Sequence, residues 1–296
     1  MKKILVGFDG SDGSRDALRL GNAFAELEGA KLIVAAVFSF DPLPVQAKTT
    51  FAEAEAEYFK QRFSEAEGRL GHGFDSRPVS WVSPAKALND IAEDEQIDLI
   101  VIGSTHRGSV GRVLPGSVGE RLLHGAPCAV AVAPRGFAQG QHVGIGLIGV
   151  AYNGTEEAKL ALDEAKRLAQ ELDCRLRLIT AVPTQTPVLL RVLYMEVLRD
   201  HFRKVLDEAT LTLGETDDVE AVLEDGDPAA VLAKHGVELD LLVIGSRGYG
   251  PLRRTLLGGV SAEVMRTAPC PVLVVPRAAK TQSAPGKAPA GSVVSG

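Results

Sequence analysis

The chain contains one sequence twice, and this internal repeat limits its fold more than any other feature. Residues 97–104 read IDLIVIGS, and residues 239–246 read LDLLVIGS, 142 positions later. The stretch APCAVAVAPR at 126–135 returns after the same interval as APCPVLVVPR at 268–277. Near the start, FDGS at 8–11 returns as YNGT at 152–155, after 144 positions. A period this long indicates two copies of a whole domain, because solenoid repeats are only about 20–50 residues long.

We therefore divide the chain into domain 1 (residues 1–135), a linker (136–143), domain 2 (144–277) and a tail (278–296). A chain of 296 residues with 45% hydrophobic and 24% charged residues has room for two globular domains of common size. The tail is rich in alanine, proline, glycine, serine and lysine. It lacks the apolar residues needed to fold, so we expect it to be disordered.

Each copy alternates apolar strands with helical segments. Strands are expected at 4–8, 32–38, 79–82, 99–102 and 128–133, and again near 148–151, 176–182, 220–224, 241–244 and 271–275. Between them lie helices, for example at 50–70, and Ser83-Pro84 and Asp227-Pro228 are expected to start two of these. Strands that are apolar throughout are typical of a parallel sheet with helices on both faces. The sequence thus predicts two tandem, doubly wound α/β domains, each with a five-stranded, mainly parallel sheet.

Composition favours a soluble protein of the cytoplasm. The net charge of −6 and the pI of about 5.6 do not suggest a nucleic-acid-binding surface. No apolar stretch is long enough to span a membrane, and the first apolar run is too short for a signal peptide. Cys128, Cys174 and Cys270 have neither a disulfide framework nor metal-ligand spacing. We expect no nucleic acid, membrane or metal ion as a partner.

One familiar motif is misleading. Residues 144–149 read GIGLIG, which matches the dinucleotide-binding pattern G-x-G-x-x-G. That pattern must follow a strand and open a helix, whereas this copy leads into a strand. The chain contains no G-x-x-x-x-G-K-[ST], G-x-S-x-G or H-E-x-x-H motif, and its six histidines are scattered. Dehydrogenase, serine-hydrolase and metal-dependent chemistry are therefore not favoured.

One group of residues in domain 1 has the chemistry of a nucleotide site. Asp9 ends the first strand, Val37 lies near the end of the second, and a glycine loop from Gly103 to Gly116-Ser117 follows the fourth. The carboxyl ends of parallel strands meet at one sheet edge, where ligands bind. Asp9 can accept from an amine or hydroxyl, Val37 can present its backbone to a base, and the loop can hold phosphates. Each residue also has a plainer interpretation: Asp9 as a turn carboxylate, Val37 as core, and the loop as a tight turn.

The glycine loops resemble the ATP-binding motif of the universal stress protein family. In domain 2, Gly245-x-x-Gly248 is followed by nine residues and then Gly258-Gly259, after a V-I-G strand and before P-V-L-V-V. The opening ILVGFDGS at 4–11 and Gly226-Asp227-Pro228 are similar to the family as well. The resemblance covers nearly the whole chain except the linker and the tail. It implies ATP as the ligand, with or without Mg²⁺, a role in stress survival without a defined reaction, and pairing of the two domains through their last strands as a pseudo-dimer within the chain.

The resemblance also implies the residues of the two sites. In domain 1 they are Gly7, Asp9, Val37, Ile102, Gly103, Thr105, His106, Gly116, Ser117 and Val118. In domain 2 they are Ala151, Asn153, Val182, Ile244, Gly245, Arg247, Gly248, Gly258, Gly259 and Val260. No catalytic residue is assigned. Protein partners are unknown, and a homodimer of chains is an open expectation.

Neither copy keeps the whole family motif. His106 stands where the motif has its second glycine, whereas Asp9, Gly103, Gly116 and Ser117 are kept. In domain 2 the three loop glycines remain, but Asn153 replaces the aspartate and Gly259 the hydroxyl residue. Asn153 can accept or donate a hydrogen bond, and Gly259 keeps its N–H. We expect both domains to bind nucleotide, with unequal strength.

Three functions remain open at this point. The first is a nucleotide-binding regulatory protein of the stress response. The second is a slow ATPase on the same site, for which His106 is the only titratable candidate within a glycine loop. The third is an interaction scaffold that binds no nucleotide, which the departures from the motif favour.

Overall fold

We describe a computed structural model of the chain that covers residues 1–38, 48–81, 83–105, 110–140, 144–184, 191–213, 218–248, 255–256 and 258–276. The predicted disorder of residues 278–296 and the predicted role of His106 lie outside these ranges. None of the helices in the described ranges combines the length and hydropathy that crossing a membrane requires.

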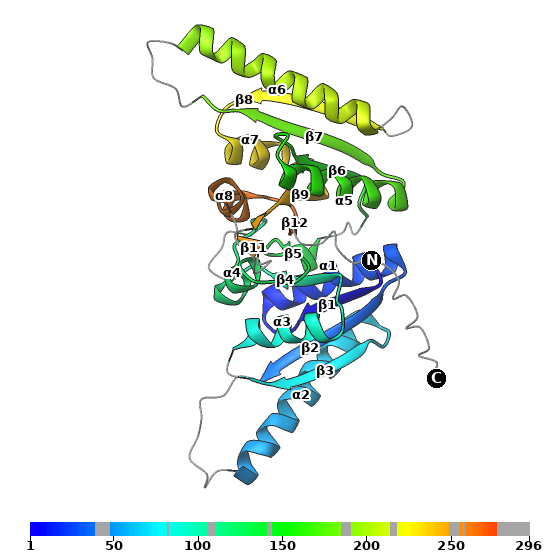
Figure 1. Cartoon of the computed structure of the whole chain (residues 1–296). Helices are drawn as coiled ribbons and strands as arrows, with labels where there is room; N and C mark the ends of the chain where they lie inside the picture. Colours follow the sequence, from blue (N-terminus) through cyan, green and yellow to red (C-terminus); the bar gives the residue numbers. More distant parts are fainter. Residues whose placement is uncertain are drawn as a thin grey trace, which may run out of the picture.

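Ten strands form one continuous sheet in the order β3-β2-β1-β4-β5-β12-β9-β6-β7-β8 (Figure 1). The strands of domain 1 are β1 (Lys3–Gly7), β2 (Lys31–Phe38), β3 (Asp75–Ser80), β4 (Leu99–Gly103) and β5 (Ala129–Ala133). Those of domain 2 are β6 (Leu147–Ala151), β7 (Arg175–Val182), β8 (Val219–Asp225), β9 (Leu241–Gly245) and β12 (Val272–Val275). Every neighbouring pair is parallel except β5 and β12. The predicted fold class is confirmed.

The last strands of the two domains join the two half-sheets. β5 and β12 pair in antiparallel register, with Val132 opposite Val272 and Val130 opposite Val274. All four side chains are buried, with at most 1% of their surface exposed. Figure 1 shows this junction at the centre of the molecule and α2 and α6 at its two far ends. The predicted intrachain pseudo-dimer is confirmed.

Four helices cover each face of the sheet. One face carries α1 (Asp12–Glu28), α2 (Lys48–Leu70), α5 (Glu156–Leu172) and α6 (Arg191–Leu213). The other carries α3 (Pro84–Asp94), α4 (Ser117–Leu123), α7 (Pro228–His235) and α8 (Gly259–Thr267). In β1, Ile4 and Val6 pack in the hydrophobic core on the face covered by α1, α2, α5 and α6, and Leu5 packs in the core on the other face. The strands are apolar throughout because side chains point alternately to two faces and both are buried.

Three local predictions need correction. β3 begins at Asp75 rather than at 79, because this edge strand is only half covered and does not read as an apolar run. Ser83 makes no side-chain capping bond to α3, whereas Asp227 accepts from Ala230 N at 3.0 Å as a cap of α7. A short hairpin of β10 (Arg247–Gly248) and β11 (Thr255–Leu256) lies in the second glycine loop and was not predicted.

The linker is packed against domain 1. Its 3₁₀ turn (Phe137–Gln139) lies beside α1, where the buried carboxylate of Asp16 accepts from Gly136 N at 2.8 Å and from Ala138 N at 2.7 Å. Arg19 of the same helix donates to the Ala138 carbonyl at 3.0 Å. These bonds fix the path of the chain between the two domains.

Removal of the Asp16 carboxylate is expected to loosen this linker. Asp16→Ala leaves two backbone N–H groups without their acceptors, which should cost about 1–3 kcal/mol of unfolding free energy. Chemical denaturation followed by circular dichroism measures the loss. Glu26→Ala on the exposed side of the same helix is the matched control and should change stability by less than about 0.5 kcal/mol. Equal losses for the two variants would contradict the assignment.

Two further contacts tie the domains together. Arg167 of α5 pairs with the fully buried Glu28 of α1 at 3.0 Å. On the other face, Val113 N donates to the Ala268 carbonyl at the end of α8 at 2.9 Å, and Arg112 donates to the Thr267 carbonyl. Because Val113 belongs to the glycine loop of domain 1, that loop is anchored on domain 2.

Candidate functional site

A cavity opens in each domain at the carboxyl ends of the parallel strands. In domain 1 the strand order reverses between β1 and β4, since β2 and β3 lie to one side and β5 to the other. Domain 2 has the same reversal between β6 and β9. The loops that leave the strands on either side of such a point diverge, and ligands of doubly wound sheets bind in the crevice between them. We call the two openings cavity 1 and cavity 2.

Cavity 1 has a volume of about 910 Å³, which is in the range of small-molecule and cofactor sites. It brings together the candidate residues of domain 1 that the structure describes. They are Gly7, Asp9, Val37, Ile102, Gly103, Thr105, Gly116, Ser117 and Val118. Most of these residues lie on or just beyond three adjacent strands, β2, β1 and β4. A ligand in cavity 1 can therefore lie across all three strands.

Asp9 presents an ionised carboxylate to cavity 1. It lies beyond β1 in a turn with Gly10 at φ +78°, and Ser11 N donates to its Oδ1 at 2.9 Å. Burial alone would raise the pKa of Asp9, but hydrogen bonds from Ser11 and Ser14 outweigh it and hold the pKa below the ordinary value of 3.8. The carboxylate is therefore charged and acts only as a hydrogen-bond acceptor.

This lowered pKa predicts how stability depends on pH. Ionised Asp9 contributes to stability above pH 3.8, and this contribution is lost as the pH falls through the lower pKa of the folded state. Wild type should therefore exceed Asp9→Asn in unfolding free energy by a constant amount above about pH 5, and the difference should narrow progressively as the pH falls below that, through 3.8 and toward the lower pKa of the folded state. Urea denaturation of both proteins across this range tests it. A difference that already shrinks above pH 5 would indicate a raised pKa instead.

The sequence analysis missed Tyr58, which lines the outer wall of cavity 1, and Arg62, which lies next to it. Tyr58 and Arg62 lie one turn apart on α2, and the Arg62 guanidinium lies 5.5 Å from the centre of the Tyr58 ring. Tyr58 donates to the Val37 carbonyl at 3.3 Å, and Arg62 donates to the Asp9 carbonyl at 3.2 Å. Val37 O therefore keeps one lone pair for a ligand. No strand-end pattern reveals these residues, because only the packing of α2 brings them to the site.

The glycine loop of domain 1 is held by its own hydrogen bonds. The buried hydroxyl of Ser104 donates to the Ala133 carbonyl at 2.7 Å and accepts from Leu114 N at 3.0 Å. Thr105 N donates to the Leu114 carbonyl at 2.8 Å, so the two arms of the loop run side by side. The two arms place Gly116 and Ser117, at the start of α4, in the lining of cavity 1.

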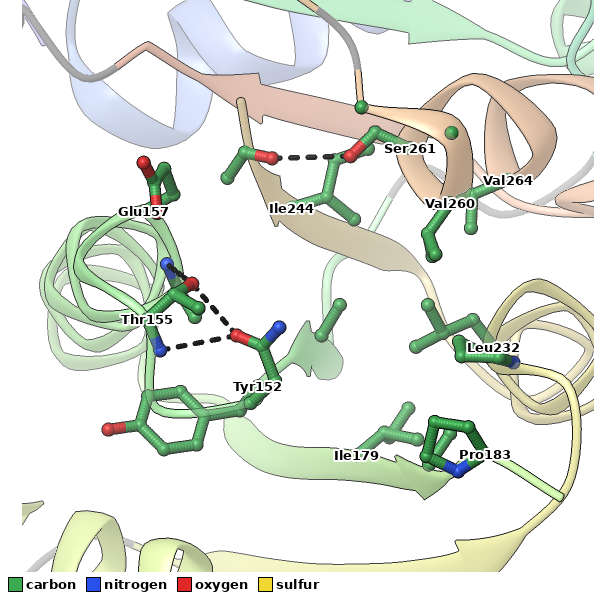
Figure 2. Close-up of a pocket in the computed structure, with 18 of the residues that line it drawn as sticks. Tyr152, Thr155, Glu157, Ile179, Pro183, Leu232, Ile244, Val260, Ser261 and Val264 are labelled. Carbon is green, nitrogen blue, oxygen red and sulfur yellow. Dashed lines mark hydrogen bonds between the residues drawn. The ribbon is translucent and has the colours of Figure 1, made fainter. Parts of the chain in front are cut away.

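Cavity 2 has the same position but a volume of only about 400 Å³. The candidate residues that line it are Ala151, Asn153, Ile244, Gly245, Gly258, Gly259 and Val260. Apolar side chains dominate one side: Figure 2 shows Ile179, Pro183, Leu232 and Val260 on the side opposite Thr155. Phe202 of α6 stands where domain 1 has Tyr58, and it has no hydroxyl to offer.

The amide of Asn153 has fewer free hydrogen-bonding positions in the structure than the amino-acid sequence suggests. Its Oδ1 accepts from Thr155 N at 3.2 Å and from the Thr155 hydroxyl at 2.8 Å, drawn as dashed lines in Figure 2. Both acceptor positions of this oxygen are therefore occupied. The expectation that Asn153 can accept from an adenine amine is thus incorrect for this structure, since only its NH₂ group remains for a ligand.

One other candidate of domain 2 lies apart from cavity 2. Val182 is fully buried and does not line it, because the alternation of β7 turns Ala181 and Pro183 toward the cavity instead. Ala181 is also the residue that corresponds to Val37 at the 144-residue interval. Arg247 and Gly248 form β10, which pairs with β11 within the second glycine loop.

The G-x-G-x-x-G stretch at 144–149 has a structural explanation. It leads into β6, as expected, and Asp240 accepts from Gly146 N at 2.8 Å and from Leu147 N at 3.0 Å. A Cβ on Gly149 would lie 2.2 Å from Leu239 Cδ1, so a larger residue here would displace the Leu239 side chain. Across the described part of the chain, no group of three or more histidine, cysteine, aspartate or glutamate residues could hold a metal ion.

The fold and the two cavities define a class of tandem α/β proteins. Each domain of such a protein has a ligand-sized opening at the point where the strand order reverses. The universal stress protein family model matches residues 1–134 and again 145–276. The chain therefore belongs to the universal stress protein family and carries two such domains.

Relatives share the tandem arrangement. The universal stress protein Rv2319c of Mycobacterium tuberculosis is 25% identical over 293 residues, covering 92% of this chain and 99% of that protein. Rv2005c of the same organism is 28% identical over 296 residues, covering 92% and 96%. The crystal structure of a universal stress protein from Archaeoglobus fulgidus covers 93% of this chain and 98% of its own, with a TM-score of 0.65 and 21% identity. At that identity the likeness concerns the fold alone.

Proposed function

We propose that this protein binds an adenine nucleotide, ATP or a close relative, in cavity 1 and acts as a regulatory protein of the stress response. The observation that carries the proposal is the set of groups along one sheet edge. The charged acceptor of Asp9 lies between the Val37 carbonyl on one side and the Gly103–Ser117 loop on the other. A nucleotide has matching groups in the same order: a base, a sugar with hydroxyl donors, and phosphates.

The cavity also fits the size and the charge distribution of such a ligand. Its volume of about 910 Å³ lies in the upper part of the range for cofactor sites. Phosphates would lie at the loop, where backbone N–H groups can donate to them. Asp9 is charged but sits at the end of β1, away from that loop by the width of one strand. It can therefore bind hydroxyl donors without facing the phosphates directly.

A regulatory role is supported by the way α2 closes the outer wall. Tyr58 donates to the Val37 carbonyl, which a ligand would approach, and Arg62 donates to the backbone carbonyl of Asp9, the residue whose carboxylate would bind the ligand. A nucleotide that takes up the free lone pair of Val37 would act on the same contacts. Occupancy of the cavity would in this way change the position of α2, which lies at the far end of the molecule (Figure 1).

Isothermal titration calorimetry with ATP tests the proposal on full-length protein freed of any co-purified nucleotide. We expect saturable binding, with and without Mg²⁺, that is weakened in Asp9→Asn by roughly 10- to 150-fold, because hydrogen bonds to charged groups contribute about 1.5–3 kcal/mol. Asp94→Asn, at an exposed carboxylate at the end of α3 that does not line cavity 1, is the control for a general change of charge. An absence of heat and of thermal stabilisation at millimolar ATP would refute the function.

A further inference from the structure

The two cavities present opposite hydrogen-bonding groups at the same place. Asp9 and Asn153 occupy equivalent positions beyond β1 and β6, each in a turn with a glycine at positive φ. In both, the Oδ1 atom accepts from the backbone N–H two residues later, at 2.9 Å from Ser11 and at 3.2 Å from Thr155. The turn is thus the same, and only the second atom of each side chain differs. That atom is a charged oxygen in Asp9 and an NH₂ group in Asn153.

The orientation of the Asn153 amide is fixed by its surroundings. A backbone N–H can only donate, so the atom facing Thr155 N must be the oxygen. The Thr155 hydroxyl accepts from Ala158 N at 3.3 Å as the cap of α5 and donates its proton to the same oxygen of Asn153. Reversing the amide would place its NH₂ group against the Thr155 N–H and lose both bonds. Cavity 2 therefore faces its ligand with a donor where cavity 1 offers an acceptor.

A second difference concerns space. Ile179 on the floor of cavity 2 stands where cavity 1 has Ala35, and Ala151 stands where it has Gly7. The Ser261 hydroxyl, absent from Gly119 in cavity 1, donates to the Gly245 carbonyl at 3.3 Å (Figure 2). Each of these side chains reduces the space in cavity 2, which has a volume of about 400 Å³ against about 910 Å³ in cavity 1.

We propose that Asp9/Asn153 and Ala35/Ile179 are the specificity-determining pairs of the chain, and that they restrict adenine-nucleotide binding to cavity 1. The inference rests on the proposed function. A ribonucleotide that donates to Asp9 meets a donor at Asn153, and Ile179 takes up space that Ala35 leaves free. Cavity 2 is accordingly selective for a smaller ligand that offers a hydrogen-bond acceptor. One chain then binds one nucleotide, although it contains two domains of the same family.

The stoichiometry of ATP binding tests this inference. Titration of the full-length wild type, freed of nucleotide, should give one site per chain, and Asp9→Asn should weaken binding at that site by roughly 10- to 150-fold. Asn153→Asp combined with Ile179→Ala gives cavity 2 the equivalents of Asp9 and Ala35, and should raise the stoichiometry to two. Since Ile179 is buried, this variant can lose stability. Asn153→Asp alone changes an exposed side chain and is expected to strengthen ATP binding in cavity 2 by roughly 10-fold or more.

The reverse exchange provides the matched control. Ala35→Ile in domain 1 should weaken ATP binding at the single site, and circular dichroism would verify that the variant is folded. Two sites in the wild type would overturn the inference and leave the proposed function standing. So would one site whose affinity Asp9→Asn leaves unchanged, because the nucleotide would then occupy cavity 2. No site at all would overturn the proposed function and this inference together.

Discussion

Replacing Gly103 with alanine is expected to destabilise domain 1 severely, whereas the same change at Gly116 is expected to leave it folded and to weaken nucleotide binding. A Cβ on Gly103 would lie 1.7 Å from the carbonyl oxygen of Gly13, in the first turn of α1. Because backbone cannot yield as a flexible side chain does, we expect a loss of about 3 kcal/mol or more. Gly103 is thus required by the packing of α1 on β4, whatever the ligand.

Gly116 is in the opposite situation. Its φ of −80° suits any residue, and the nearest atom to an added Cβ is Thr105 Cβ at 3.6 Å. Gly116→Ala should therefore alter unfolding free energy by less than about 0.5 kcal/mol, while its methyl group occupies part of cavity 1 and lowers ATP affinity roughly tenfold or more. Thermal denaturation and calorimetry of the two variants separate the two roles. Comparable destabilisation by both would show that the glycines serve one purpose.

The same comparison is available in domain 2. A Cβ on Gly245 would meet the Glu157 carbonyl oxygen at 2.2 Å, whereas one on Gly259 has no atom within 4 Å. Gly245→Ala should therefore destabilise the protein, and Gly259→Ala should not. In both domains the first glycine of the motif is explained by the contact between a strand and a helix.

A charge at the centre of the sheet is expected to unfold both domains together. Val132 of β5 is fully buried opposite Val272, at the junction of the two half-sheets. Val132→Asp would place a carboxylate there without a partner, which should cost about 3–5 kcal/mol. Because β5 and β12 are shared by the two cores, we expect one cooperative transition at a much lower denaturant concentration, measured by circular dichroism and by intrinsic fluorescence.

Val237→Asp is the control for this prediction. Val237 is 73% exposed, so the same substitution should change stability by less than about 0.5 kcal/mol. Loss of domain 1 alone, with domain 2 unfolding at its wild-type midpoint, would contradict a shared core. The contacts of Asp16 with the linker and of Arg167 with Glu28 also favour a single transition.

The predictions from sequence succeeded where a pattern is local or repeated. Continuous apolar strands indicated a parallel sheet, and the repeat indicated two domains. β3 was placed too late because edge strands are only half buried and do not read as apolar runs. Val182 was chosen one position away from the lining residue Ala181, and in a strand one position reverses the side chain. A comparison at the repeat interval of 144 would have selected Ala181 directly.

The lining of cavity 1 was predicted in part. The residues at strand ends and in the first glycine loop do lie around cavity 1, because the carboxyl ends of parallel strands converge whatever the side chains. Tyr58 and Arg62 were missed, since α2 reaches the site from a distant part of the chain. No sequence pattern could predict which atom of the Asn153 amide is free for a ligand, because hydrogen bonds in the folded turn decide this.

By itself the sequence determined the duplication, the layered α/β fold and the strand ends at which ligands can bind. These follow from periodicity and from turn chemistry, which act over short distances along the chain. Only the tertiary structure decided that Gly103 is needed for the packing of α1 on β4, whereas Gly116 keeps space open in cavity 1. It also decided that Asp9 offers a hydrogen-bond acceptor where Asn153 offers a donor. The physical reason is that both the volume of a cavity and the hydrogen-bonding atoms that a side chain has free depend on neighbours that folding brings together.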